Sequence, residues 1–152
     1  MAKFRYRMQN ILDVKEKLKT QAENEFAIAA ANVAEEEEIL EGLYKRKIEY
    51  EEYLTEIQKG NLDFRTIKET AQAIESMKYL IENQKQALAK AEQVLEIRRV
   101  ALAEAMQEVK THEKLKEKQF QQFMADEAAK ESKEIDELVS FRFGNGGSSG
   151  NG

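Results

Sequence analysis

The fold is decided by residues 67–109, which read IKETAQAIESMKYLIENQKQALAKAEQVLEIRRVALAEAMQEV. An aliphatic residue stands at every seventh position of this stretch: Ile67, Ile74, Ile81, Leu88, Leu95, Leu102 and Val109. A second, smaller and partly polar column follows three residues after each of these: Thr70, Met77, Gln84, Ala91, Arg98, Ala105 and His112. Two such columns form the seam of a coiled coil, the stripe of side chains that faces a partner helix. A helix of this length is longer than a small domain is wide, so its seam needs an equally long partner.

The composition agrees with long helices. The 152 residues include no proline, 35% are charged, and the formal net charge is -5. An acidic chain without a basic stripe is not expected to bind nucleic acid, since that binding needs clustered cations. Cysteine is absent, which removes disulfides and thiolate zinc sites. No window has the apolar length of a signal peptide or a membrane span, so we expect a soluble, cytoplasmic protein.

The first half of the chain supplies the partner helix. We predict a helix from Phe4 to Gln58, because apolar residues there recur at steps of three and four. Its predicted seam begins Phe4, Met8, Ile11, Lys15, Leu18, Ala22, Phe26, Ala29 and Val33, and continues to Ile57. The two successive steps of four from Leu18 to Phe26 indicate a stutter, which locally relaxes the supercoil.

A turn near residues 59–62 separates the two helices. Gly60 and Asn61 both tolerate the left-handed conformation that ends helices, and Asp63 can cap the helix that follows. A short connection makes the helices antiparallel. The predicted fold is therefore all-α: residues 1–143 form an antiparallel coiled-coil hairpin, and residues 144–152 form a disordered tail of Gly, Ser and Asn.

Folding the chain at Gly60 places Val33 opposite Leu88 and Ile11 opposite Val109. Because both helices rise about 1.5 Å per residue, equal numbers of residues pair along them, and the second helix extends about twenty residues past the end of the first. This overhang carries Phe120, Phe123 and Met124, and we expect nothing in the chain to cover them.

No pattern indicates catalysis, a metal or another cofactor. His112 and Glu108 lie one turn apart, but a di-iron bundle needs Glu-x-x-His on two helices, and position 109 is Val. No phosphate-binding loop or nucleophile motif is present. Polar seam residues are interpreted mainly as fixing the register of the two helices, and alternatively as a face read by a partner; they are Lys15, Lys47, Gln84 and Arg98.

Several segments resemble the flagellar export protein FliJ family. They are Lys3 to Asp13 (KFRYRMQNILD), Glu49 to Leu54 (EYEEYL), Glu113 to Lys118 (EKLKEK) and Glu131 to Leu138 (ESKEIDEL). The resemblance covers about residues 1–143. It implies a cytoplasmic, non-enzymatic stalk of the flagellar type III export apparatus, located at the flagellar base and peripheral to the inner membrane only through its partners.

The resemblance also implies partners and surfaces. The partners are the hexameric export ATPase, the cytoplasmic domain of the export gate, and export chaperones. The ATPase-binding end would comprise Phe4, Arg5, Tyr6, Met8, Phe120, Phe123 and Met124. The gate-binding patch would comprise Leu43, Tyr50, Met77 and Leu80, although Arg46, Ala73 and Gln84 depart from the residues expected around it.

Three alternatives remain at this stage. The chain could be the equivalent stalk of a virulence secretion system, or a general holdase chaperone that grips unfolded clients. A metal-dependent bundle enzyme is the third, and the single histidine argues against it.

Overall fold

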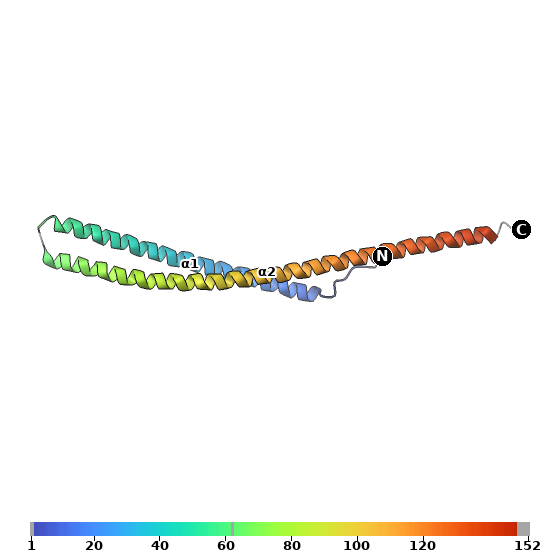
Figure 1. Cartoon of the computed structure of the whole chain (residues 1–152), viewed down its shortest axis with the longest axis horizontal. Coiled ribbons are helices and arrows are strands. Elements are labelled where there is room, and N and C mark those ends of the chain that lie inside the picture. Colours follow the sequence, from blue (N-terminus) through green and yellow to red (C-terminus); the bar gives the residue numbers. More distant parts are fainter. Residues whose placement is uncertain (1, 62, 149–152) are drawn as a thin grey trace. The chain divides into compact units, whose positions relative to one another are not determined.

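The computed structural model describes residues 2–61 and 63–148, and over these residues it consists of two helices joined by a turn (Figure 1). Helix α1 spans Gln9–Gln58 and helix α2 spans Phe64–Ser148. The predicted all-α antiparallel hairpin is confirmed. The chain divides into two compact units: a terminal unit of residues 1–17 and 106–152, and a turn unit of residues 18–105.

In the turn unit the predicted seam of α2 is confirmed. None of its predicted members between Ile67 and Ala105 is exposed, and Ile74, Met77 and Ile81 are the most buried among the aliphatic ones. Ala22, Ala29 and Val33 are the most buried seam residues of α1 in this unit. The core is thus a single line of small and aliphatic side chains along the contact between two helices.

Polar contacts across the turn unit fix its antiparallel register. The Gln84 amide donates hydrogen bonds to the backbone carbonyl of Glu36, at 3.1 Å, and to its carboxylate. Arg98 Nη1 lies 3.1 Å from Glu25 Oε2. Both pairs agree with the register expected from folding the chain at Gly60. Gln84 and Arg98 therefore pair between the helices, which agrees with the register interpretation.

The seam of α1 differs from the prediction near its start. Leu12 is only 3% exposed, whereas Ile11 is 43% and Leu18 47% exposed. Lys19 is half-buried in place of Leu18. The seam here consists of Met8, Leu12, Lys15, Lys19, Ala22 and Phe26, which are all buried or half-buried and alternate steps of four and three.

The predicted stutter is therefore wrong, and the heptads of α1 run without interruption. The prediction chose the more apolar residue at each step, but the angular position around the helix decides which side chain faces the partner. Lys19 can occupy a seam position because its methylene stem packs there while its ammonium reaches Glu23, 4.0 Å away.

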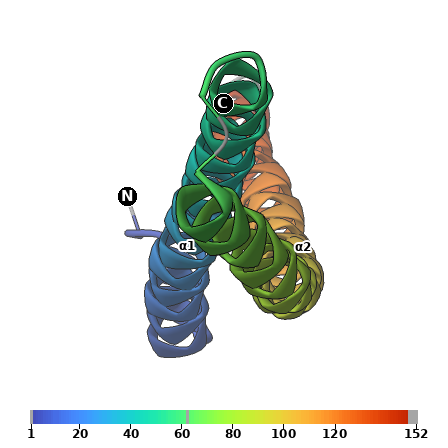
Figure 2. The same ribbon diagram turned by 90° about the vertical axis from the view of Figure 1, so that its left-hand side faces the viewer.

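The connection between the helices is capped by Asp63. Its carboxylate accepts hydrogen bonds from the Arg65 backbone N–H, at 3.1 Å, and the Thr66 hydroxyl, at 2.9 Å. These bonds, with that of the Thr66 hydroxyl the largest cause, lower the pKa of Asp63 below its ordinary value of 3.8. Figure 2 views this end of the turn unit, where α1 ends and α2 begins.

Two details of the ends differ from prediction. No described residue has a positive φ, so Gly60 does not use the left-handed conformation expected of it. Helix α2 continues through Gly144 to Ser148, into the stretch assigned to the tail. Leu62 and residues 149–152 lie outside the described residues, so the predictions that fall on them stay predictions.

Candidate partner-binding surfaces

The first residues of the terminal unit do not form a helix: residues 2–6 have no regular secondary structure, and residues 7–8 form a turn. We call residues 2–8 the strap, because α1 begins only at Gln9 and not at the predicted Phe4. Along the strap Phe4, Tyr6 and Met8 are buried or half-buried, while Arg5 and Arg7 are exposed. This alternation with a period of two is typical of an extended chain with one face against the protein.

The strap packs its aromatic face onto α2. The Phe4 ring meets Phe120 edge to face at a centroid distance of 5.3 Å, and lies 5.5 Å from the ring of Phe123. Edge-to-face pairs add about 0.5–1.5 kcal/mol beyond the buried area. Tyr6, 5% exposed, forms a core cluster with Leu12 and Val109.

The expectation that Phe120 and Phe123 are uncovered is therefore wrong. An extended chain advances about 3.3 Å per residue against 1.5 Å for a helix, so the strap reaches further along α2 than a helix would. Phe120 is 36% exposed and Met124 is 48% exposed. The overhang proper starts later, at Ala128, because every side chain from Ala128 to Gly144 is exposed.

Polar contacts join the beginning of α1 to α2. Lys116 Nζ donates a hydrogen bond to Gln9 Oε1 at 2.7 Å. Lys15 Nζ lies 2.7 Å from Glu108 Oε2, and this hydrogen bond is the main cause of a lowered pKa of the Glu108 carboxyl. Glu108 is thus an ion-pair partner of Lys15, and the nearby His112 contributes a smaller part of the lowering of its pKa.

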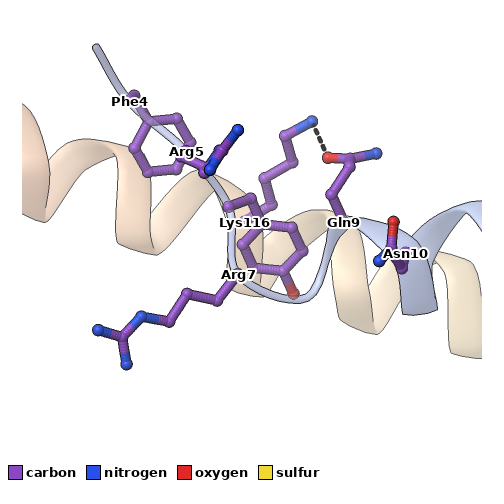
Figure 3. Close-up of a pocket in the computed structure, with 7 residues that line it drawn as sticks. Phe4, Arg5, Arg7, Gln9, Asn10 and Lys116 are labelled. Carbon is purple, nitrogen blue, oxygen red and sulfur yellow. Dashed lines mark hydrogen bonds between the residues drawn. The ribbon is translucent and has the colours of Figure 1, made fainter.

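A groove opens beside the strap (Figure 3). Its volume is about 560 Å³, and it is lined by Phe4, Arg5, Tyr6, Arg7, Gln9, Asn10 and Lys116. Residues 2–17 and 106–119 together hold nine Lys and Arg against five Asp and Glu, although the whole chain carries -5. The groove therefore lies in a locally basic part of an acidic protein.

Of the seven residues predicted for ATPase binding, the structure brings all but Met124 together along one part of α2. Phe4, Tyr6 and Met8 belong to or pack on the core cluster and its aromatic neighbours, and Arg5 lines the groove. Met124 lies one turn beyond Phe120. The prediction missed Arg7 and Lys116, which line the same groove. The alternation of basic and apolar residues from Lys3 to Met8 was the signal for Arg7.

The residues predicted for gate binding lie in the turn unit with different exposures. Met77 is 8% exposed and belongs to the seam, and Leu43 and Tyr50 are half-buried seam residues of α1. Leu80 is 42% exposed. Leu80 is therefore the most accessible of the four residues to a partner, whereas Leu43 and Tyr50 are accessible only in part.

The described residues contain no cluster of three or more His, Cys, Asp or Glu that could hold a metal. Over the same residues, no stretch of helix is long and apolar enough to span a membrane. The Tyr6 hydroxyl and His112 Nδ1 are buried without a hydrogen-bond partner among the described residues.

Comparison with known proteins now assigns the chain. The model of the family described as "Flagellar FliJ protein" matches residues 4–148. The chain belongs to the FliJ family. That match includes the strap from Phe4 onward and all of both helices, and no curated protein sequence gives a significant match.

A solved structure supports the fold of this FliJ-family chain. It is described as a YscO homologue, CT670 of Chlamydia trachomatis, and is 20% identical with a TM-score of 0.72. The similarity covers 91% of this chain and 94% of that chain. As a FliJ-family member the protein is a stalk-like component of type III export or secretion, in a family of non-catalytic coupling proteins.

Proposed function

We propose that the protein is the stalk of a flagellar type III export apparatus, binding the hexameric export ATPase and promoting its assembly and activity. The carrying observation is the family match over residues 4–148, which spans both surfaces described above. The chain works through helical surfaces and needs no catalytic group of its own. It would lie in the cytoplasm at the flagellar base, held near the inner membrane through its partners.

The ATPase-binding surface in this proposal is the strap with the part of α2 beneath it. Phe4, Phe120 and Phe123 form a continuous aromatic contact there, and Arg5 and Arg7 point their charges to solvent beside it. Buried aromatic and arginine residues are the usual anchors of protein interfaces. Unequal contacts with the subunits of a ring would bias their nucleotide states, which is a coupling free energy between sites.

The test uses purified export ATPase. Addition of the protein is expected to raise ATP hydrolysis and give co-elution, and the double variant Arg5→Glu, Arg7→Glu is expected to lose about tenfold in affinity, as two charged contacts of about 0.7 kcal/mol each would give. The matched control is Lys45→Glu, Arg46→Glu, two exposed cations on α1 of the turn unit. Absence of both co-elution and stimulation for the wild-type protein would sink the proposal.

The proposal includes a second surface, around Leu80, that contacts the cytoplasmic domain of the export gate, and contacts with substrate chaperones. Leu80→Ala is the informative change because Leu80 is exposed, whereas a change at Met77 would disturb the seam. Tyr79→Ala is the control, since Tyr79 is 69% exposed one position away. If Leu80→Ala binds the gate domain as well as the control Tyr79→Ala does, Leu80 is not part of this surface.

A virulence secretion stalk is the second candidate, favoured by the fold shared with the YscO homologue. Complementation separates the two systems. Restored swimming in a cell lacking its own FliJ protein, and with it chemotaxis, supports the flagellar role. Restored secretion of virulence substrates without restored swimming supports the other.

A further inference from the structure

The overhang of α2, residues 128–148, presents apolar side chains that nothing in the terminal unit covers. Ile135 is 59%, Leu138 62% and Val139 45% exposed. In Figure 1 no helix of the terminal unit lies beside this last part of α2. A lone helix of this length is only marginally stable in water, so contact with another helix would stabilise it.

The apolar stripe of the overhang is not an extension of the seam that faces α1. Continued at the same spacing, that seam would pass through Lys130, Lys133, Glu137 and Ser140, which are all polar. The stripe instead contains Ile135 and Leu138, with Glu131 four residues before and Arg142 four residues after. Steps of four, three and four place these side chains on one face of the helix.

The order of side chains in this stripe makes it self-complementary. In an antiparallel pair of helices centred between Asp136 and Glu137, Ile135 of one copy opposes Leu138 of the other. The same register places Glu131 opposite Arg142 at both ends. Neither Glu131 nor Arg142 forms an ion pair within the described residues, so both charges are available for a partner.

We propose that two copies of this protein associate through their overhangs as an antiparallel two-stranded coiled coil. Every position of the stripe then meets its complement, and the interface obeys a twofold axis, as most homodimers do. A parallel pair would instead place Glu131 against Glu131 and Arg142 against Arg142. Charge complementarity therefore selects a second copy, in the antiparallel orientation, as the partner.

The shape of the surface agrees with this pairing. Leu138 and Phe141 line a shallow hollow together with Glu134 and Glu137, and the opposing Ile135 would enter it. About three helical turns per copy make a small interface, so the dimer dissociates on dilution. The pairing does not depend on the proposed function, and it would compete with any other partner of the overhang.

The test is sedimentation equilibrium from about 1 to 500 µM, a range that covers the weak affinities of small interfaces. We expect reversible dimerisation of the wild-type chain. Glu131→Arg or Arg142→Glu alone is expected to weaken it about tenfold, since two attractive exposed pairs become repulsive. An equimolar mixture of these two variants is expected to dimerise as well as wild type, because each Arg then meets a Glu.

The control variant is Lys133→Glu, which lies on the opposite face of the overhang and is expected to dimerise like wild type. Circular dichroism of each variant checks that the helix content is unchanged. A monomer at all concentrations overturns the proposal. So does a dimer that Glu131→Arg leaves intact, or a mixture of the two variants that fails to recover.

Disulfide trapping tests the orientation of the two helices. Because the chain has no native cysteine, only the introduced thiols can cross-link. Ile135→Cys mixed with Leu138→Cys is expected to give more cross-linked heterodimer on mild oxidation than either variant alone gives homodimer. Preferential homodimers of Ile135→Cys would indicate a parallel pair and overturn the register.

Discussion

At the scale of single residues, polar side chains of this hairpin stabilise it through hydrogen bonds to residues near them in the sequence. Asp63 is the clearest example, since its carboxylate accepts bonds from Arg65 and Thr66 at the start of α2. An N-cap satisfies backbone donors that the helix leaves unpaired, and a negative charge there also interacts favourably with the helix dipole.

Asp63 therefore gives a pH-dependent prediction. Its pKa is lowered in the folded protein, so its contribution is complete above the unfolded value and is lost as the pH falls through the folded value. At about pH 6 the melting temperature should fall from wild type to Asp63→Asn to Asp63→Ala, because Asn keeps the cap without the charge. Wild type and Asp63→Asn should converge once the pH falls below the lowered pKa of Asp63 in the folded protein.

Thermal melts followed by circular dichroism check this order. A gap between wild type and Asp63→Asn that persists unchanged to low pH would show that the carboxylate charge is not the cause. Asp136→Asn serves as the control, because it lies on the exposed overhang and should leave the melting temperature unaltered.

At the scale of the elements, the heptads of α1 decide which neighbouring side chain is core. Leu12→Ala is expected to cost about 2–5 kcal/mol of unfolding free energy, as large-to-small core changes do. Ile11→Ala should cost about 1 kcal/mol or less, because Ile11 is 43% exposed and Leu12 3%. Urea unfolding of both variants measures the difference. A greater loss of unfolding free energy in Ile11→Ala than in Leu12→Ala would instead support the predicted stutter.

The strap is the other element that departs from the predicted helix. Its alternation of basic and apolar residues was visible in the sequence, but Phe4 and Met8 also satisfy a helical spacing of four. Short apolar stretches are compatible with both periods. Packing against Phe120 and Phe123 decides in favour of the extended chain, because only that conformation brings Phe4 to them.

At the scale of the whole molecule, the uneven charge is the feature with a functional consequence. The chain carries -5, yet the strap and the segments around it are basic. Electrostatic attraction of a partner to such a surface is screened by salt, with a Debye length of about 10 Å at 0.1 M and about 3 Å at 1 M.

If the export ATPase binds at the strap, association should slow as salt is raised from about 0.1 to about 0.5 M, since screening acts mainly on the encounter rate. Stopped-flow or surface-based binding measures the rate. The variant Arg5→Glu, Arg7→Glu should show a flatter salt dependence than wild type, and the variant Lys45→Glu, Arg46→Glu should keep the wild-type slope. Equal slopes for all three would place the contact elsewhere.

The sequence by itself determined the hairpin, the seam of α2, the turn and its Asp63 cap, because these follow from periodicity and local capping along one chain. It also carried the segments that resemble the FliJ family. Only the tertiary structure decided that Leu12 rather than Ile11 faces α2, and that the strap covers Phe120 and Phe123. The first depends on the direction in which a side chain points around its helix, and the second on how far the strap extends along α2. The pattern of hydrophobic residues along one chain specifies neither.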